Sequence, residues 1–491
     1  MKSLAVYLKE YKKESILAPL FKLLEVVFDL LVPVVVAQII DVGVAQDNRS
    51  YVVQMFFVLI LMAGVGLACS FTAQFFAAKA SCGFAAKLRQ AMFDHIQSLS
   101  FTELDTMGTD TLITRLTDDV NQVQNGLNLG LRLLLRSPFV VLGSMVMAFT
   151  INARLACIYL VAVIILGILL FLIMSHATKY FQQAFPKYDD LNESVQENVS
   201  AIRVVKAYVR EEQETSKLRR ASENIYNIFV KAETNLVFNA PMMQTAVYTC
   251  ILLVSWFGAK MIASDSLTTG ELMSLLTYCM NILMSLMMLS MVFVMVAMSM
   301  ASARRISEVL NETSDLKNPE HPATKVEDGS IEFRHVDFAY KKDSDEPVLE
   351  DIDLKIRSGE TIGIIGGTGS AKTSLVNLIS RLYDVTTGSI KVGGMDVRSY
   401  DMETLRNQVA VVLQKNVLFS GTILENLRWG NKEASKEECI RACQLACADE
   451  FIERFPQKYN THIEQGGNNV SGGQKQRLCI ARALLKKPKI L

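Results

Sequence analysis

Six stretches of this 491-residue chain are long and apolar enough to cross a lipid bilayer. A membrane-spanning helix needs about 20 apolar residues. Water is absent from the hydrocarbon core, so the backbone N–H and C=O groups of such a segment must pair within a helix. We therefore predict an α-helical transmembrane domain over residues 1–310. The predicted spans are residues 16–40, 52–78, 133–151, 155–175, 236–262 and 272–298.

The gaps between these spans alternate between short and long. The short gaps, residues 41–51, 152–154 and 263–271, contain Arg49 and Arg154 as their only basic residues. The N-terminus and the long gaps carry many lysines and arginines, and such a bias is typical of cytoplasmic segments. The pattern predicts a multi-pass protein of the cytoplasmic membrane with its N-terminus and its C-terminal region in the cytoplasm.

The long gaps keep a helical spacing of apolar residues and contain few glycines or prolines. This pattern predicts that the helices continue beyond the membrane through residues 79–132 and 176–235. Near the middle of each gap the pattern turns, at residues 100–109 and 198–208. We expect these two turns to contact a cytoplasmic domain.

Charge and cysteine content narrow the function classes. Fifty basic and fifty acidic residues give zero net charge, which argues against nucleic-acid binding. Three of the nine cysteines, Cys439, Cys443 and Cys447, are spaced by four and would share one helix face. Since no histidine or fourth cysteine completes a set nearby, we interpret them as small residues packed between helices rather than metal ligands.

The first span contains three ionisable residues on one helical face, Lys22, Glu25 and Asp29. Charges inside a membrane are costly and often functional, so they are candidates for a cavity lining that attracts cations. Alternatively, Lys22 pairs with Glu25 near the cytoplasmic end and all three lie near water. The sixth span is rich in methionine, which suits either varied apolar ligands or ordinary packing. These methionines are Met273, Met280, Met284, Met287, Met288, Met291, Met295 and Met298.

The character of the sequence changes at residues 311–328, which contain two prolines and many charges and form a predicted linker. Residues 329–491 then read as a soluble α/β domain. Strand-like runs occupy residues 330–338, 348–356, 360–365 and 389–392, and a fully apolar run occupies 409–413. Helical patterns cover residues 372–382, 436–453 and 473–486.

Within this domain, residues 361–380 (TIGIIGGTGSAKTSLVNLIS) combine an apolar run, a glycine-rich turn and a helical pattern. This arrangement holds a polyphosphate, because backbone N–H groups and the helix N-terminus face the anion, a lysine adds charge and a hydroxyl reaches Mg²⁺. The pattern G-x-x-x-x-G-K-[ST] is met except that Ala371 replaces the second glycine. The predicted nucleotide-binding residues here are Gly366, Gly367, Thr368, Gly369, Ser370, Ala371, Lys372, Thr373 and Ser374.

Other residues support nucleotide binding. Tyr340 ends a predicted strand and can stack on an adenine ring, although it can also be a surface aromatic. Gln414 directly follows the apolar run VAVVL, at a strand end where ligands bind in α/β sheets, and can orient a water or contact Mg²⁺. A glycine-rich helix start forms a second candidate anion site, with a simple helix N-cap as the alternative. Its residues are Ser471, Gly472, Gly473 and Gln474.

Taken together, these motifs resemble those of ATP-binding-cassette (ABC) proteins. Residues 366–373 resemble the Walker A loop, Gln414 the glutamine of the Q-loop and VSGGQ the family signature. Six spans before such a domain resemble an exporter half-transporter, and the chain is most similar to one arm of bacterial heterodimeric multidrug exporters. Residues 100–120 and 198–212 resemble the two coupling regions of that family.

The resemblance implies roles for individual residues. Lys372 is expected to hold the β- and γ-phosphates of ATP, Thr373 to bind Mg²⁺ and Tyr340 to stack on adenine. Gln414 is expected to contact the metal and the attacking water, which makes it the candidate catalytic residue. The signature residues Ser471, Gly472, Gly473 and Gln474 are expected to contact ATP bound to a partner chain.

The sequence departs from the family pattern in two ways. Ala371 places a Cβ where the loop approaches phosphate, and it would be strained by about 1 kcal/mol or more if the backbone there requires a positive φ. The sequence also stops at Leu491, before the segment expected to carry the Walker B strand. We therefore expect a C-terminally truncated nucleotide-binding domain that does not hydrolyse ATP normally, since the Mg²⁺-binding aspartate and the general base would be missing.

The implied function is ATP-driven export of hydrophobic or amphipathic compounds by one half of a dimeric ABC transporter. The expected partners are a second half-transporter (a heterodimer or a homodimer), a hydrophobic small molecule and the lipid bilayer, with no nucleic acid. Lipid or peptide export on the same scaffold is an alternative, and an ATP-gated channel or regulatory subunit is another.

Overall fold

The computed structural model describes residues 4–340 and 346–491 and divides the chain into two compact units. The first unit contains Met1–Asp94 and Leu112–Asn311, and the second contains His95–Thr111 and Glu312–Leu491. Residues 95–111, which the sequence places within the transmembrane domain, thus group with the C-terminal unit. This segment contains the short helix α3 (Phe101–Met107).

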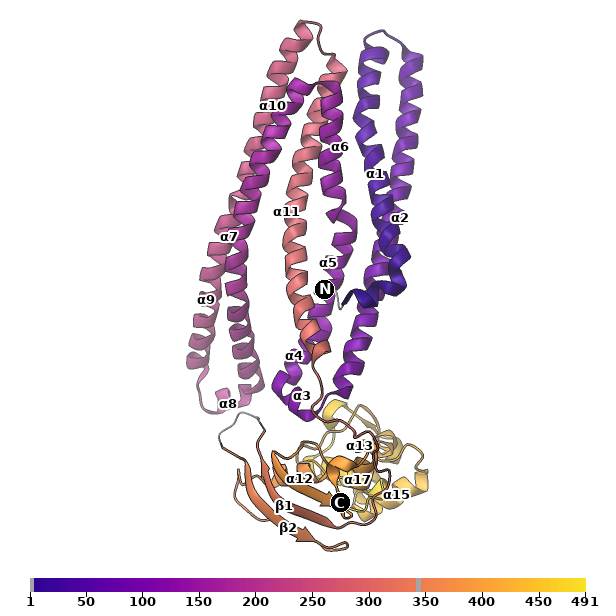
Figure 1. The fold of residues 1–491 in the computed structure, drawn as a ribbon, viewed down its shortest axis with the longest axis vertical. Helices are drawn as coiled ribbons and strands as arrows, with labels where there is room; N and C mark the ends of the chain where they lie inside the picture. Colours follow the sequence, from indigo (N-terminus) through magenta and orange to yellow (C-terminus); the bar gives the residue numbers. More distant parts are fainter. Residues whose placement is uncertain (1–3, 341–345) are drawn as a thin grey trace. The chain divides into compact units, whose positions relative to one another are not determined.

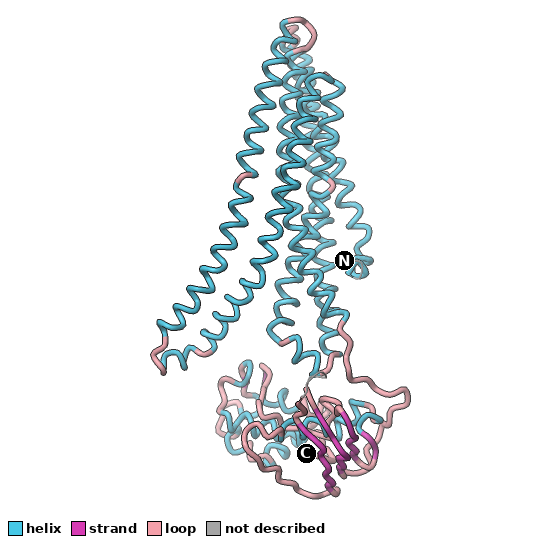
Figure 2. The backbone as a smooth tube through the Cα atoms, turned by 60° about the vertical axis from the view of Figure 1, so that its left-hand side comes forward, coloured by secondary structure: helices cyan, strands magenta, loops and turns pink. Residues whose placement is uncertain are grey.

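The first unit is almost entirely helical (Figures 1 and 2). Among the described residues, six helical stretches are long and apolar enough to cross a membrane, and they coincide with the six predicted spans. The helices that contain these spans are α1 (Lys12–Gln38), α2 (Arg49–Ser98), α6 (Arg136–Ile151), α7 (Ala153–Ser200), α10 (Asn239–Ala263) and α11 (Thr269–Asn311).

Two of these helices extend far beyond a membrane thickness, as the sequence predicts. Helix α2 has 50 residues and α7 has 48, because neither contains enough glycine or proline to interrupt the helical pattern. Further helical elements complete the description of this region. They are the 3-10 helix η1 (Leu4–Tyr11), the π-helices η2 (Ile39–Val44), η3 (Arg115–Asp119) and η4 (Gly130–Leu134), and the helices α4 (Thr109–Thr114), α5 (Val120–Leu129), α8 (Ile202–Ala207) and α9 (Glu211–Val237).

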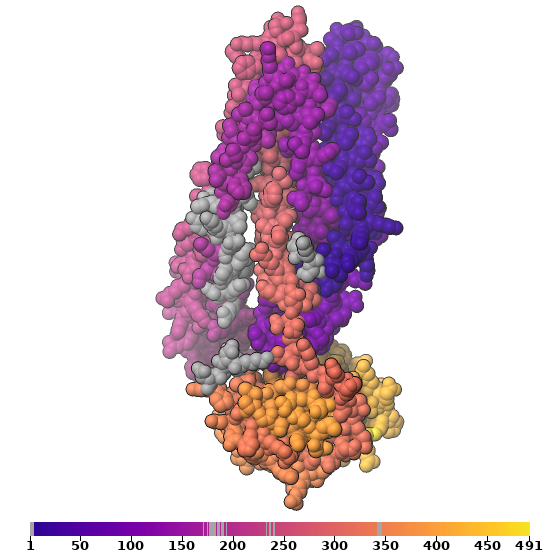
Figure 3. All heavy atoms as spheres, in the orientation of Figure 1, coloured from indigo at the N-terminus to yellow at the C-terminus, as the bar shows by residue number. Residues whose placement is uncertain are grey.

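Helix α11 is central to the packing of this unit, since it contacts α1, α5, α6 and α10. In Figure 3 its surface (salmon) lies beside that of residues 112–151 (purple) on one face of the helices. Two buried tyrosines join α11 to its neighbours through hydrogen bonds. Tyr278 donates to the carbonyl of Leu30 at 2.7 Å, and Tyr159 donates to the carbonyl of Leu275 at 3.1 Å. These bonds satisfy hydroxyls that would otherwise be buried without partners.

The second unit contains a four-stranded antiparallel sheet with the order β2-β1-β3-β4. In strand β1 the pairing register with β2 shifts between Phe333 and Val336, and this irregularity lets both residues be buried although they are three positions apart. Phe333 pairs with Leu354 on one side and Ile390 on the other, which fixes the register. The strands are β1 (Ile331–Phe338), β2 (Leu349–Ile356), β3 (Thr387–Val392) and β4 (Met395–Asp396).

The helices of the second unit between residues 423 and 485 enclose a separate hydrophobic core, whereas the two helices within residues 372–408 pack on the core of the sheet. Cys439 and Cys443 are buried in the separate core, which confirms the interpretation that they pack between helices, whereas Cys447 is exposed. The helices are α12 (Lys372–Ile379), α13 (Met402–Gln408), α14 (Ile423–Arg428), α15 (Lys436–Leu445), α16 (Asp449–Ile452) and α17 (Gly472–Leu485). The remaining elements are the strand pair β5 (Gly421–Thr422) and β6 (His462–Ile463) and the 3-10 helices η5 (Val397–Ser399), η6 (Lys458–Asn460) and η7 (Gln465–Gly467).

Two predicted strands are wrong. Residues 360–365 are irregular in the structure, with Ile365 98% exposed, and residues 409–413 form a single bridge between Val409 and Ile490. An apolar run of this kind becomes a strand when neighbouring strands pair with it and helices cover it. Within the described residues no strand pairs with residues 360–365. The run therefore lacks the neighbouring strand that it would need to form a strand itself.

Three side chains cluster on the exposed face of β1 and β2, namely His335, Asp351 and Asp353. The Nδ1 atom of His335 lies 2.7 Å from Asp351 Oδ1 and 3.2 Å from Asp353 Oδ2. Their ligand atoms lie within 4.8 Å of one another, a spacing that a metal ion can also use. Hydrogen bonding and opposite charge already account for the geometry, so we interpret the group as an ion-pair cluster.

This cluster predicts a pH-dependent contribution to stability. The hydrogen bond to Asp351 and the charge of Asp353 raise the pKa of His335 above its usual range. Protonated His335 therefore stabilises the folded domain fully below the unfolded pKa of about 6.5, and this gain disappears as the pH rises through the folded pKa. We expect His335→Gln to lower the thermal unfolding midpoint at about pH 5.5 and to leave it unchanged at about pH 9.

The matched control is Arg334→Gln on the same strand, whose guanidinium pairs with Glu332 at 2.9 Å and stays charged at both pH values. Its effect should be the same at both. An equal loss for His335→Gln at both pH values would contradict a protonation-linked role.

Candidate nucleotide-binding site

The glycine-rich loop folds around the ammonium group of Lys372. Lys372 donates to the carbonyl of Gly366 at 2.9 Å, to the carbonyl of Gly367 at 2.7 Å and to Ser370 Oγ at 3.0 Å. The helix that follows, α12, begins at Lys372, so the loop leads into a helix N-terminus as predicted. The lysine and the free N–H groups of the first turn form a concentrated positive region, which suits an anion.

The loop leaves room for a ligand at two glycines. A Cβ added at Gly367 or Gly369 would meet no atom within 4 Å, and Gly369 has a φ of 85°. Backbone at these positions can therefore approach a bulky group without obstruction. This openness, together with the lysine, is the structural observation that fits a polyphosphate.

Ala371 adopts a left-handed backbone conformation, with a φ of 54° and a ψ of 19°. The positive φ is the conformation for which glycine is the usual residue, so the alanine is strained. Its methyl group packs against the core that includes Phe338 and Leu378, rather than standing free in the loop. The structure thus associates Ala371 with backbone strain and gives no indication of a methyl group that crowds the phosphates.

We expect Ala371→Gly to stabilise the domain by about 0.5–1 kcal/mol, because relief of the left-handed strain outweighs the added freedom of the unfolded chain. Affinity for ATP should change by less than about twofold, since a change of 0.4 kcal/mol corresponds to that factor. Thermal unfolding and equilibrium ATP titration measure the two quantities.

The matched control is Ala442→Gly within helix α15, where the same substitution should destabilise by about 1 kcal/mol. Stabilisation of similar size at both positions would show that strain at Ala371 is not the cause. A large gain in ATP affinity for Ala371→Gly would instead support steric crowding.

The residues that follow the lysine face different environments. Thr373 is exposed, so its hydroxyl is accessible to a metal ion, whereas Ser374 is buried. Ser374 Oγ lies 2.8 Å from the hydroxyl of Tyr340. The structure therefore brings the predicted adenine-stacking residue next to the phosphate-loop helix.

Tyr340 is half-exposed and contacts other aromatic rings edge-on. Its ring centroid lies 4.8 Å from that of Phe338 and 5.2 Å from that of Tyr383. These contacts hold the ring near the loop, and 42% of the residue remains accessible. An aromatic face at this position is available to a base, and stacking on adenine stays a prediction.

Gln414 lies at an exposed position in irregular backbone after Leu413. The parallel strand that was expected to place its amide at a sheet edge is not formed, as described for residues 409–413. Its proposed contacts with metal and water stay predictions, because they depend on that strand.

The signature residues form the N-terminus of helix α17. Ser471 is the N-cap, and Gln474 is the third residue of a capping box in which Gln474 Oε1 accepts from the Ser471 N–H at 2.9 Å. The simple N-cap interpretation is therefore confirmed. Gly472 and Gly473 are exposed, and a Cβ added at either would meet no atom within 4 Å. The cap leaves the helix start open, which is compatible with contact to an anion on another molecule.

The sequence did not reveal that Tyr383 contacts the first coupling segment. The hydroxyl of Tyr383 donates to Asp105 Oδ2 at 2.6 Å, and its ring lies 6.0 Å from that of Phe101. Burial raises the pKa of Tyr383, and the nearby carboxylate adds to the effect, so the phenol stays protonated as a donor. The segment containing Asp105 was predicted to contact a cytoplasmic domain, but the residue that it meets there was not predicted.

The same segment is also joined to the linker. The side chain of Glu103 accepts hydrogen bonds from the backbone N–H of Ser100 at 2.8 Å and of Asp315 at 3.1 Å. Nε2 of His95 lies 2.9 Å from the carbonyl oxygen of Glu312. The first coupling segment, the start of the linker and the region after helix α12 therefore form one connected set of contacts.

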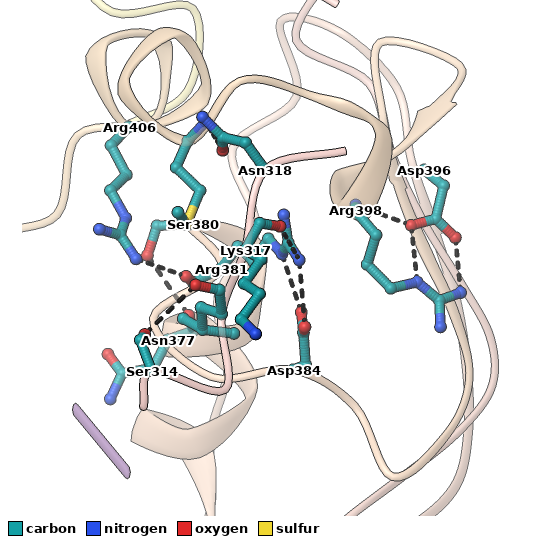
Figure 4. A network of polar contacts seen from close by, with 12 residues as sticks. Ser314, Lys317, Asn318, Asn377, Ser380, Arg381, Asp384, Asp396, Arg398 and Arg406 are labelled. Atoms are coloured by element: carbon teal, nitrogen blue, oxygen red, sulfur yellow. Dashed lines mark hydrogen bonds and ion pairs between the residues drawn. The ribbon is translucent and has the colours of Figure 1, made fainter. Parts of the chain in front are cut away.

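Figure 4 shows how the linker is attached after helix α12. Arg381 is buried and pairs with Asp384 through Nε at 2.9 Å, while its Nη2 donates to the carbonyl of Lys317 at 3.3 Å. Asn318 donates to Asp401 at 2.7 Å, and Arg406 donates to the carbonyl of Arg381 at 2.8 Å. Charged hydrogen bonds of this kind fix the path of the linker on the domain.

Comparisons with known proteins agree with these features. Residues 15–287 match the family model described as the ABC transporter transmembrane region, and residues 349–491 match the model described as ABC transporter. The chain is 35% identical over 485 residues to YfiB of Bacillus subtilis, an uncharacterized ABC transporter ATP-binding protein, with 99% of this chain and 84% of that protein covered.

Two further relatives are similar to this chain over most of its length. An uncharacterized ABC transporter ATP-binding protein of Mycobacterium tuberculosis is 34% identical over 489 residues, covering 99% of this chain and 84% of that protein. The ATP-dependent lipid A-core flippase of Desulfotalea psychrophila is 32% identical over 404 residues, covering 82% and 70% respectively.

The chain belongs to the ABC transporter family. It is an exporter half-transporter, a multi-pass membrane protein with an N-terminal transmembrane domain of six apolar helices followed by an ABC ATPase domain. Membership of this ATPase family implies that the chain binds ATP.

Proposed function

We propose that the chain is one half of a dimeric exporter that uses ATP to move hydrophobic or amphipathic compounds across the cytoplasmic membrane. The observation that carries the proposal is the open loop around Lys372, directly before a helix N-terminus, in a chain that also has six apolar spans. The proposed domains are residues 1–310 for the transmembrane part, 311–328 for the linker and 329–491 for the nucleotide-binding part.

The proposed roles at the site follow from the chemistry of the side chains. Lys372 holds the β- and γ-phosphates, Thr373 presents its hydroxyl to Mg²⁺, and Tyr340 stacks on adenine. Gln414 orients water and contacts the metal. ATP, when bound, supplies the free energy of phosphoryl transfer, and the loop residues from Gly366 to Ser374 bind and orient its phosphates.

The signature helix serves a second nucleotide in this proposal. Ser471 and the open backbone of Gly472 and Gly473 face ATP held by a partner half-transporter, with Gln474 beside them. The departure from the glycine of the pattern at Ala371 motivates the further proposal that this chain pairs with a different half-transporter and contributes the slower of two ATP sites. Single-turnover hydrolysis, measured separately at the two sites of the complete transporter, tests this asymmetry, and fast hydrolysis at the Ala371 site would refute it.

Transport is tested in inverted membrane vesicles that contain the full-length transporter and its partner. ATP-dependent uptake of a hydrophobic dye supports multidrug-type export, and ATP-dependent movement of a fluorescent phospholipid between leaflets supports lipid export. The lipid alternative is favoured specifically by the relative named as a lipid A-core flippase. ATP-gated ionic current without uptake of either probe would refute export and favour the channel alternative.

We also propose that Tyr383 and Asp105 couple the ATPase domain to the transmembrane domain, because their hydrogen bond joins helix α3 to the region behind the phosphate loop. Tyr383→Phe removes the hydroxyl and keeps the ring contacts. A hydrogen bond to a charged group contributes about 1.5 kcal/mol or more, so transport should fall by about tenfold while ATP affinity stays unchanged.

The control for this coupling test is Tyr459→Phe, because Tyr459 is buried among the helices of the same unit. It should leave transport per ATP hydrolysed unchanged. An equal fall in ATP binding and transport for Tyr383→Phe would indicate a folding defect and contradict the coupling role.

A further inference from the structure

The charged residues of helix α1 divide between two environments. The ammonium group of Lys22, 7% exposed, lies 2.7 and 2.6 Å from the two carboxylate oxygens of Glu25 and 3.3 Å from Ser70 Oγ on helix α2. All of its donors have acceptors, so this pair is closed within the seam between α1 and α2. The part of the sequence-based interpretation in which Lys22 pairs with Glu25 is therefore confirmed.

Asp29, one turn further on, instead lines a cavity of ≈ 480 Å³ between helices α1, α6 and α11. Its carboxylate faces Arg136 of helix α6, with Oδ2 3.3 Å from Nη2. Polar side chains of helix α11, Thr277 and Asn281, share the lining, and the methionines Met284 and Met288 continue it. The cavity therefore combines one charge of each sign with uncharged polar groups and a flexible apolar wall.

Hydrogen bonding in this cavity is incomplete. The Nε atom of Arg136 is buried and has no hydrogen-bond partner among the described residues. A buried donor without an acceptor is costly. The π-helix η4 ends at Leu134, two residues before Arg136, and such turns often mark functional sites. An acceptor supplied by a ligand would satisfy the guanidinium.

The charge pair also restricts which ligand fits. A simple cation would bind Asp29 and leave Arg136 without its carboxylate, whereas a simple anion would bind Arg136 and leave Asp29 unpaired. Each alternative leaves one charge of the pair without its partner, either the guanidinium, whose side chain is 25% exposed, or the carboxylate, whose side chain is 49% exposed. A ligand that carries both charges replaces both partners at once.

We propose that this cavity binds the head group of a zwitterionic amphiphile. The anionic group of the ligand lies on Arg136, its ammonium group on Asp29, and Thr277 and Asn281 hydrogen-bond to the polar atoms between them. The apolar tail lies along Met284 and Met288, whose flexible side chains adapt to different chains. The inference rests on the proposed export function and specifies the substrate class of that function.

The test uses three probes with the same dodecyl tail and different heads: dodecylphosphocholine, dodecyl phosphate and dodecyltrimethylammonium. Binding of the radiolabelled probes, below their micellar concentrations, is measured on the full-length transporter and its partner in nanodiscs. Wild type should bind the zwitterion about tenfold more tightly than either singly charged probe, a factor typical of one charged hydrogen bond. Asp29→Asn should shift the preference to the phosphate, and Arg136→Gln should shift it to the ammonium.

Two further variants guard against misfolding. The double variant Asp29→Asn/Arg136→Gln leaves no uncompensated charge and should bind the three probes with similar affinity. The matched control Lys22→Gln/Glu25→Gln removes the neighbouring ion pair, which lies outside the cavity, and should keep the preference of wild type. A control that loses the preference, or cavity variants that retain it, would overturn the inference.

A competition arm identifies the source of the zwitterion. Displacement of dodecylphosphocholine by phosphatidylethanolamine in the nanodisc assigns the site to a membrane lipid, and displacement by a soluble alkyl betaine alone assigns it to a single-chain amphiphile. If no probe binds wild type, export of amphiphiles fails together with the inference. If all probes bind wild type equally, only the inference is overturned.

Discussion

Replacement of Lys372 by alanine should weaken ATP binding by about a hundredfold, which corresponds to about 3 kcal/mol from charge-assisted hydrogen bonds to phosphate. In the structure the ammonium group is held by the carbonyls of Gly366 and Gly367 and by Ser370 Oγ. The ammonium group is therefore positioned at the centre of the loop, where its donors can also reach a phosphate. Equilibrium titration with a fluorescent ATP analogue measures the loss.

The control removes an equal charge from the same domain at a distance from the loop. Lys355 is exposed on strand β2, and Lys355→Ala should leave ATP affinity within about twofold of wild type, because exposed charges are strongly screened. Loss of the Lys372 carbonyl contacts should also loosen the loop, so faster amide hydrogen exchange at residues 366–371 is expected. Unchanged ATP affinity for Lys372→Ala would refute the assignment of the loop.

The helices of the first unit were predictable because their signal is local. Long apolar runs with few glycines and prolines require helices in a membrane and favour their continuation beyond it, and α2 and α7 follow that rule. The antiparallel strands β1 to β3 were also predictable from alternating patterns. The strand predicted at residues 360–365 is wrong because its formation is not a local matter. A fully apolar run becomes a strand only when other strands pair with it.

The face shared by Lys22, Glu25 and Asp29 was predictable from helical spacing, whereas their separate environments were not. Which neighbour each side chain meets depends on Ser70 of α2 and Arg136 of α6, residues 48 and 107 positions away from their partners. The contact between Asp105 and Tyr383 spans 278 positions. Hydrophobic period and motif spacing carry no information about such pairs in a single sequence.

The candidate nucleotide-binding site likewise has local features that the sequence predicts and long-range contacts that it does not. The loop, the lysine and the cap at Ser471 are local motifs whose backbone geometry follows from their residues, including the strain at Ala371. The hydrogen bond between Tyr340 and Ser374 required the fold to bring a strand end beside helix α12. Local motifs therefore predict the class of ligand, while the fold determines which aromatic side chains lie near the loop.

The largest effect on stability is expected at an ion pair between the buried carboxylate of Asp119 and Arg305, whose side chain is 42% exposed. Asp119 lies in the π-helix η3 with its side chain 6% exposed. Arg305 of helix α11 donates to Asp119 Oδ2 through Nε at 2.8 Å, and Nη2 donates to Oδ1. Removal of the guanidinium leaves a buried carboxylate without its cation, so Arg305→Met should destabilise the transporter by about 2–4 kcal/mol.

Two further variants distinguish the loss of the charge of Arg305 from the loss of its packing. Asp119→Asn/Arg305→Met removes both charges and should be more stable than Arg305→Met alone, since no unpaired charge remains. Arg219→Met removes an arginine whose side chain is 80% exposed and pairs with Glu223, and it should change stability by less than about 0.5 kcal/mol. Thermal unfolding of the purified full-length transporter in one detergent measures all three.

The order of the unfolding midpoints decides the interpretation. An uncompensated carboxylate requires the single variant Arg305→Met to be the least stable and the double variant to recover part of the loss. If the double variant is no more stable than the single one, then the packing of the arginine stem, rather than the buried charge, holds the π-helix in place. Because only helix α4 separates η3 from the helix that contains Asp105, the same variants should then also weaken transport without a change in ATP affinity.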